Sequence, residues 1–146
     1  MKKIIHHFQI KASPETVFDA IGTQSGLSKW WSKVVEAEET IGGIVKFTFI
    51  DVFNPRMKIT EYDKPNVISW TCVSGHEPWA ENIFKFLIKT DGPDASLHFT
   101  QDYARELSDE QYGTYNFNWA FYLESLRQLC EEGRGRPFDP ATGKSG

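Results

Sequence analysis

Hydrophobic and polar residues alternate at the start of the chain. Ile4, Phe8 and Ile10 lie at even-numbered positions, and polar residues occupy most of the positions between them. A period of two residues is that of a β-strand with one buried face. We therefore predict a strand over residues 3–11.

Two short helices are predicted after this strand. The first covers residues 14–22, because Ser13 can cap it and its first residue is a proline, which lacks the N–H that a helix start leaves unpaired. The second is predicted over residues 26–32, where apolar residues recur at helical spacing. Adjacent residues of a helix point about 100° apart, so we expect Trp30 or Trp31 to face a cavity rim or the surface.

The middle of the chain predicts a meander of antiparallel strands. Short apolar runs are separated by turn sequences such as Gly42-Gly43 and Asn54-Pro55. The predicted strands cover residues 34–38, 44–50, 56–62, 67–73, 81–89 and 95–103. Because the connections are short, we expect neighbouring strands to be antiparallel.

A long amphipathic helix is predicted to follow the strands. Ser108 and Gln111 fit a capping box, and a helix over residues 109–132 would be about 36 Å long. Its apolar stripe consists of Tyr112, Tyr115, Trp119, Tyr122 or Leu123, Leu126, Leu129 and Cys130. Because no other predicted element can cover seven strands, we expect an α+β fold in which a curved antiparallel sheet wraps around this helix.

Composition and charge narrow the class of protein. The 146 residues predict one domain over residues 1–132 and a C-terminal tail over residues 133–146. A net charge of −4 argues against a nucleic-acid partner. No apolar run is long enough for a signal peptide or a membrane span, so we expect a cytoplasmic protein with no membrane partner. The only cysteines, Cys72 and Cys130, predict neither a disulfide framework nor a zinc site, and no cofactor is expected.

The order of several short motifs resembles that of the START-like, or SRPBCC, helix-grip superfamily. The motifs are Ala12-Ser13-Pro14-Glu15-Thr16-Val17-Phe18, Leu27-Ser28-Lys29-Trp30-Trp31, Gly42-Gly43, the stretch from Asp63 to Trp70, and Trp119 with Leu123 and Leu126. Within this superfamily the sequence is most similar to the family related to the activator of the heat-shock-protein-ninety ATPase. The resemblance implies a helix-grip fold with a cavity between sheet and helix. Its members include binders of lipids, polyketides, hormones or aromatics, a few cyclases and hydrolases, and a branch that stimulates a chaperone ATPase.

Strand parity and helix phase select the residues expected to line this cavity. The positions expected to face inward on the predicted strands are mainly apolar, but three of them hold the polar residues His6, Glu61 and Gln101. The candidate ligand-binding residues are Trp30, Trp31, Phe47, Phe49, Met57, Glu61, Trp70, Phe84, Phe99, Gln101, Tyr115, Trp119 and Tyr122. We expect the polar ones to bind each other, the long helix or a ligand, unless they lie near strand ends and reach water. For Trp70 and Trp119, core packing is the favoured role and contact with a ligand is the alternative.

Three functions remain open. The 11 Phe, 5 Tyr and 5 Trp favour non-catalytic binding of a small, largely apolar molecule, by a monomer or a homodimer. The family resemblance implies a chaperone-associated interaction module as the second. A cavity enzyme is the third, and His6, Glu61 and His98 are its only candidate acid or base groups. The sequence after His76-Glu77 does not continue into the HExxH zinc pattern, so no metal site and no catalytic residue are predicted.

Overall fold

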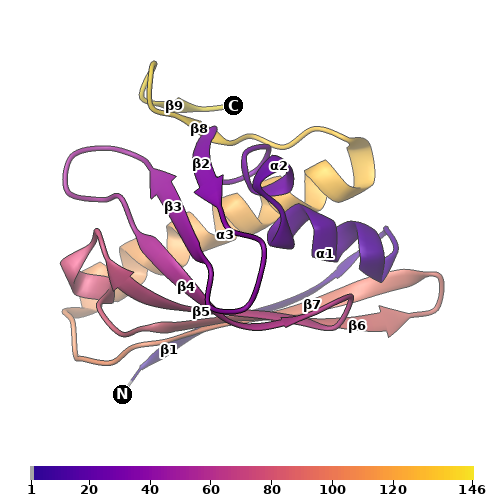
Figure 1. Cartoon of the computed structure of the whole chain (residues 1–146), viewed down its shortest axis with the longest axis horizontal. Coiled ribbons are helices and arrows are strands. Elements are labelled where there is room, and N and C mark those ends of the chain that lie inside the picture. Colours follow the sequence, from indigo (N-terminus) through magenta and orange to yellow (C-terminus); the bar gives the residue numbers. More distant parts are fainter. Residues whose placement is uncertain (1) are drawn as a thin grey trace.

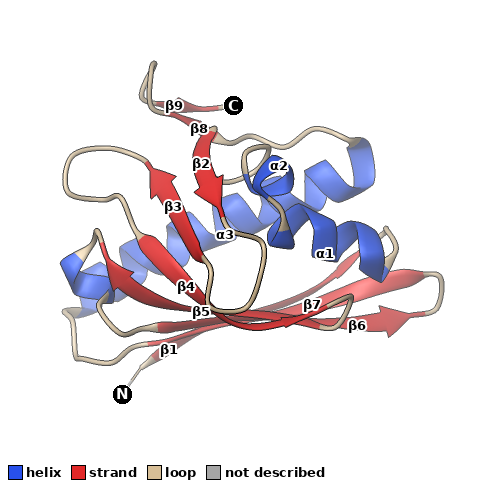
Figure 2. Ribbon diagram, in the orientation of Figure 1, coloured by secondary structure: helices blue, strands red, loops and turns tan. Residues whose placement is uncertain are grey.

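The computed structural model describes residues 2–146 and contains a seven-stranded antiparallel sheet with its helices on one face (Figures 1 and 2). The strands are β1 (Lys3–Ile10), β2 (Val34–Ala37), β3 (Ile44–Thr48), β4 (Arg56–Asp63), β5 (Val67–Ser74), β6 (Ile83–Asp91) and β7 (Asp94–Asp102). Their order across the sheet is β1-β7-β6-β5-β4-β3-β2. The strands from β2 to β7 therefore form a meander, and β1 pairs with the last of them. The predicted fold class is confirmed.

The long helix α3 (Asp109–Glu132) lies over the sheet (Figure 2). Ser108 and Gln111 form the predicted capping box, in which each side chain accepts a hydrogen bond from the other residue's backbone N–H. Gly133 ends the helix in the left-handed region with φ of 80°, which glycine adopts without a Cβ clash. The helix passes unbroken through Gly113, and its inner face buries Trp119 among the core side chains.

The segment between β1 and β2 contains two helices, but the second is shorter than expected. α1 (Pro14–Gly22) matches its predicted bounds, whereas α2 (Gln24–Leu27) has only four residues and is followed by turns. A second short helix is therefore present as predicted, but its predicted bounds of 26–32 are wrong. Trp30 and Trp31 follow α2 in turns, so helical spacing does not set the directions of their side chains. Both are buried, and their nearly parallel rings have centroids 6.0 Å apart.

Strand alternation correctly predicts which side chains fill the core. The inward positions that it selected on β4 to β7 and on and just after β3 are all buried: Phe47, Phe49, Met57, Ile59, Ile68, Trp70, Phe84, Phe86, Leu97 and Phe99. Together with side chains from α1 and α3 they form one hydrophobic cluster. Two of the three polar residues with inward parity contact α3. Gln101 is fully buried against Trp119, and His6 hydrogen-bonds to the Asn116 side chain at 2.9 Å.

The alternation fails at Glu61, which was expected to face inward. The register of β4 against β5 shifts between Ile59 and Glu61, and such a bulge moves the following side chain to the opposite face. Glu61 accepts a hydrogen bond of 2.6 Å from the Ser69 hydroxyl and lies 3.5 Å from Lys85 Nζ. Ser69 and Lys85 alternate with inward residues, so Glu61 belongs to the outer face of the sheet.

The segment after α3 packs against the fold through a short two-stranded sheet, β8 (Phe138–Asp139) and β9 (Lys144–Ser145). The Phe138 N–H donates to the Trp31 carbonyl at 2.8 Å, and the Phe138 carbonyl accepts from the Lys33 N–H at 2.9 Å. These bonds fix the Phe138 ring beside the core. Between residues 2 and 146, none of the helices has the length and hydrophobicity needed to cross a bilayer.

Candidate functional site

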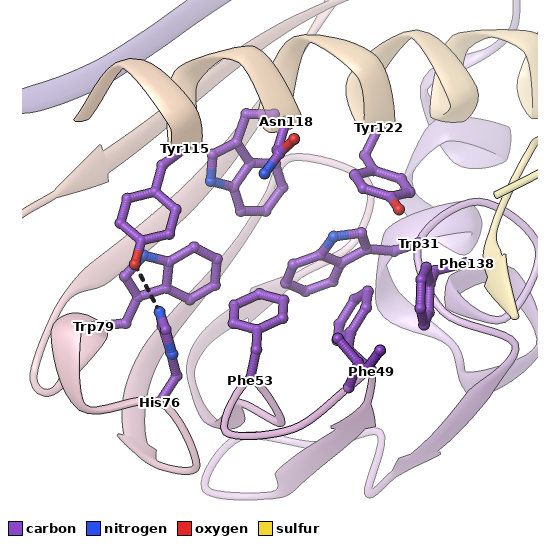
Figure 3. Close-up of a pocket in the computed structure, with 11 residues that line it drawn as sticks. Trp31, Phe49, Phe53, His76, Trp79, Tyr115, Asn118, Tyr122 and Phe138 are labelled. Carbon is purple, nitrogen blue, oxygen red and sulfur yellow. Dashed lines mark hydrogen bonds between the residues drawn. The ribbon is translucent and has the colours of Figure 1, made fainter. Parts of the chain in front are cut away.

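An apolar pocket lies between α3 and one end of the sheet (Figure 3). Its volume is about 310 Å³, which falls in the range of small-molecule sites. The lining residues are Trp31, Phe49, Ile50, Phe53, His76, Trp79, Tyr115, Asn118, Trp119, Tyr122 and Phe138. Aromatic rings make up most of this lining, so a bound molecule would be surrounded mainly by flat apolar surfaces.

Segments that are distant in sequence bring these side chains together. The face of α3 between Tyr115 and Tyr122 forms one wall, because side chains three and four residues apart lie on the same side of a helix. The β3–β4 connection contributes Phe53, and the β5–β6 connection contributes Trp79. Phe138 reaches the pocket from β8. The site therefore depends on two loops and on the C-terminal segment as well as on the sheet and helix.

Trp31 connects the pocket to the hydrophobic core. Its ring centroid lies 4.4 Å from that of Phe47, 5.0 Å from that of Trp119 and 6.1 Å from that of Trp70. The Trp79 ring, at 6.4 Å, extends the cluster toward the β5–β6 connection. Because close-packed rings of this kind have few alternative positions, the floor of the pocket is formed before any ligand enters.

A histidine and a tyrosine form a hydrogen-bonded pair at one end of the pocket. His76 precedes the short helix η1 (Glu77–Trp79), and its Nε2 lies 2.8 Å from the Tyr115 hydroxyl (Figure 3). Burial lowers the pKa of His76 below its ordinary value, an effect that the Val52 backbone offsets only in part. Burial also raises the pKa of Tyr115. Both side chains are therefore neutral near pH 7.

The opposite end of the pocket contains a second tyrosine hydroxyl. Tyr122 hydrogen-bonds to the Ser145 hydroxyl of β9, and burial raises the pKa of Tyr122. Figure 3 shows Asn118 between the two tyrosines on the same helix. Asn118 is exposed to solvent, and so is Ile50, another lining residue. These two residues mark the mouth.

The structure separates the predicted site residues into two groups. Those that line the pocket are Trp31, Phe49, Tyr115, Trp119 and Tyr122. Those that do not are Trp30, Phe47, Met57, Glu61, Trp70, Phe84, Phe99 and Gln101. Apart from Glu61, the second group is buried in the core. Strand parity therefore identified the core side chains that lie beneath the pocket. These side chains pack so closely against one another that few of them reach the pocket.

Sequence reasoning missed the pocket residues that lie outside regular strands. Parity applies only to strands, so it gave no position for Phe53, His76 or Trp79 in the connections or for Phe138 after the last helix. One signal was present: Phe53 and Trp79 are large aromatic residues in turn-rich segments, where polar residues are more usual. Asn118, in turn, lies three residues after Tyr115 on α3 and so falls on the face that lines the pocket.

The candidate acid and base groups lie outside the pocket. His6, Glu61 and His98 do not line the pocket. Burial raises the pKa of Cys72 to about 11 and that of Cys130 to about 12, so both thiols stay protonated near neutral pH. Among residues 2–146, no three histidine, cysteine, aspartate or glutamate side chains are grouped so that they could hold a metal ion.

Comparisons with known proteins identify relatives of the whole fold. The family model for Activator of Hsp90 ATPase homolog 1-like protein matches residues 11–131. A comparison with curated proteins finds no match. The solution structure of the Aha1 dimer from Colwellia psychrerythraea is 30% identical, with a TM-score of 0.83 over 92% of this chain and 100% of that one.

Two further solved structures share the fold at low sequence identity. A protein from Staphylococcus saprophyticus is 16% identical, with a TM-score of 0.77 over 93% of this chain and 97% of that one. A protein from Mesorhizobium loti is 15% identical, with a TM-score of 0.75 over 88% of this chain and 96% of that one. Proteins with very different sequences therefore share this backbone architecture.

Proposed function

The chain belongs to the family of Activator of Hsp90 ATPase homolog 1-like proteins, and we propose that this member binds a small, largely apolar molecule in the aromatic pocket between α3 and the sheet. The observation that carries the proposal is the pocket itself, with its volume of about 310 Å³ and its lining of mainly aromatic side chains. Moving apolar ligand surface from water into such a pocket is favourable by about 25 cal/mol per Å². The exposed Asn118 at its mouth leaves a route for entry.

Binding without turnover fits the chemistry of the lining. The described lining residues include no carboxylate, no cysteine and no serine that could act as a nucleophile. The histidine of the pocket, His76, is already hydrogen-bonded to Tyr115. We therefore assign the polar groups a role in orienting a ligand rather than in reacting with it.

A thermal-shift series with small apolar ring compounds, such as 2-methylnaphthalene, tests the proposal. A ligand present at about 100 times its dissociation constant stabilises the folded state by about 2.7 kcal/mol, so the melting temperature should rise by several degrees. If no compound of the series raises the melting temperature, the proposal fails.

A blocking variant links any such shift to this pocket. Asn118→Trp places a large ring at the mouth and should weaken binding by at least about 10-fold, which corresponds to about 1.4 kcal/mol. Ala120→Trp is the matched control, because residue 120 is exposed and points about 160° away from residue 118 around α3. Equal affinities in the two variants would show that the compounds bind elsewhere.

The comparisons favour a second candidate function, the stimulation of a chaperone ATPase. It rests on the description of the family and on the 30% identity to the Colwellia Aha1 protein. The test is the rate of ATP hydrolysis by a purified Hsp90-type chaperone with and without this chain. A rate that increases equally with the wild type and with Asn118→Trp would support a partner-binding role independent of the pocket. An unchanged rate would remove this candidate.

A further inference from the structure

The polar atoms at one end of the pocket point to a specific class of ligand. Tyr115 and His76 lie side by side at the end opposite Tyr122 and Phe138 (Figure 3). His76 also interacts with the Val52 backbone, but its buried Nδ1 has no partner of normal hydrogen-bond geometry among the described residues. The pair therefore has hydrogen-bonding capacity that the rest of the protein does not use.

The capacity of the Tyr115 oxygen depends on which atom of the pair is the donor. If Tyr115 donates to His76 Nε2, its oxygen keeps lone pairs that can accept a hydrogen bond. If His76 Nε2 carries the proton and donates, the Tyr115 hydroxyl proton is free for another acceptor. A hydroxyl group both donates and accepts, so it satisfies Tyr115 in either arrangement.

The surroundings of the pair disfavour an anionic ligand group. Burial keeps His76 and Tyr115 neutral near pH 7, and the described lining contains no lysine, arginine, aspartate or glutamate. A carboxylate or other anion brought into such an environment without a partner of opposite sign is strongly disfavoured. The rings around the pair, such as Phe53 and Trp79, instead offer apolar surface to a flat ring.

We propose that the pocket selects hydroxylated aromatic compounds of the phenol class, with the ligand hydroxyl bonded to Tyr115 and the aromatic ring packed against Phe53, Trp79 and the wall of α3. This inference rests on the proposed function, because it names the ligand group that the same pocket recognises. Tyr115 then determines specificity, and His76 is a positioning residue that holds the Tyr115 hydroxyl in place.

The test compares 2-naphthol with 2-methylnaphthalene, which has nearly the same shape but no hydroxyl. Dissociation constants of both compounds are measured by NMR titration with the wild type and with Tyr115→Phe. Each compound is compared with itself in the two proteins, so the free energy that it needs to leave water cancels. We expect Tyr115→Phe to weaken 2-naphthol by about 5-fold relative to its effect on 2-methylnaphthalene, the value of one ordinary hydrogen bond.

Tyr62→Phe is the matched control, because the Tyr62 hydroxyl donates to the Gly22 carbonyl and does not line the pocket. The same ratio for Tyr62→Phe should be close to one. Equal weakening of both compounds by Tyr115→Phe, or a selective loss of 2-naphthol in Tyr122→Phe instead, would overturn the inference while leaving the proposed function intact. If neither compound binds the wild type, both the proposed function and the inference fail.

Discussion

The Trp119 indole N–H donates a hydrogen bond of 2.8 Å to the Gln101 side-chain oxygen, and both side chains are buried. This bond joins the middle of α3 to β7 at a place where neither group can reach water. It also explains why a glutamine lies on the largely apolar inner face of the sheet. Gln101 therefore connects the helix to the sheet beneath the pocket and does not line the pocket itself.

Replacing Gln101 should destabilise the fold. In Gln101→Leu the Trp119 N–H loses its buried acceptor, and an unsatisfied buried donor costs about 1–3 kcal/mol. Urea unfolding followed by tryptophan fluorescence measures the change in the free energy of unfolding. Gln9→Leu, at an exposed position of β1, is the matched control and should change it by less than about 0.5 kcal/mol. Equal effects of the two substitutions would contradict this role for Gln101.

Removing a large ring from the core beneath the pocket should be costly. Trp70 is 1% exposed and Phe84 is 0% exposed, so Trp70→Ala or Phe84→Ala should lower the free energy of unfolding by about 3–5 kcal/mol. Phe117→Ala is the control, since Phe117 is 74% exposed and its removal should change stability by no more than about 0.5 kcal/mol. Losses below about 1 kcal/mol at Trp70 or Phe84 would mean that the rings are not packed as described.

Stability should depend on pH through His76. Its pKa is lowered from the ordinary value of 6.5, so the unfolded chain takes up a proton at this residue more readily than the folded protein does. The stability associated with neutral His76 is complete above the unfolded pKa and is lost as the pH falls through the folded pKa. The wild type should therefore lose stability relative to His76→Gln as the pH falls from about 7.5 to below 6.5. A difference in unfolding free energy that stays constant over this range would contradict the effect.

Glu61→Gln should leave the pocket unchanged. Glu61 lies on the outer face with Ser69 and Lys85, and its hydrogen bond from Ser69 is the main cause of its lowered pKa. Because the ion pair with Lys85 is solvent-exposed, its loss should change the free energy of unfolding by less than about 1 kcal/mol. The dissociation constants of 2-methylnaphthalene and 2-naphthol should match those of the wild type in the NMR titration. A selective change in either dissociation constant would show that Glu61 takes part in ligand binding.

The sequence allowed most of the fold to be predicted because its signals were local and repeated. The capping box of Ser108 and Gln111 fixed the start of α3, and alternation fixed the buried face of the strands. Glu61 was misplaced because a single bulge reverses the alternation, and no residue type marks a bulge in advance. The second short helix was predicted to be too long because the spacing of Leu27, Trp30 and Trp31 reflects tertiary packing and not a helix.

The candidate site was less predictable than the fold. Trp31, Tyr115 and the other predicted lining residues lie on or next to regular elements, where spacing carries directional information. The pairing of His76 with Tyr115 joins residues 39 positions apart through a loop. Phe138 reaches the pocket only because the segment after Gly133 folds back along Trp31. Contacts of this kind depend on the path of irregular backbone, for which the sequence has no periodic signal.

The most direct test of the central claim is an NMR measurement of nuclear Overhauser effects between bound 2-methylnaphthalene and the assigned side chains. Binding in the pocket predicts contacts from the compound to the rings of Phe53, Trp79, Tyr115 and Phe138, which four separate segments bring together. These contacts should disappear in Asn118→Trp and persist in Ala120→Trp. The absence of contacts to these rings in the wild type, or contacts confined to the outer face of the sheet around Ser69 and Lys85, would contradict the account.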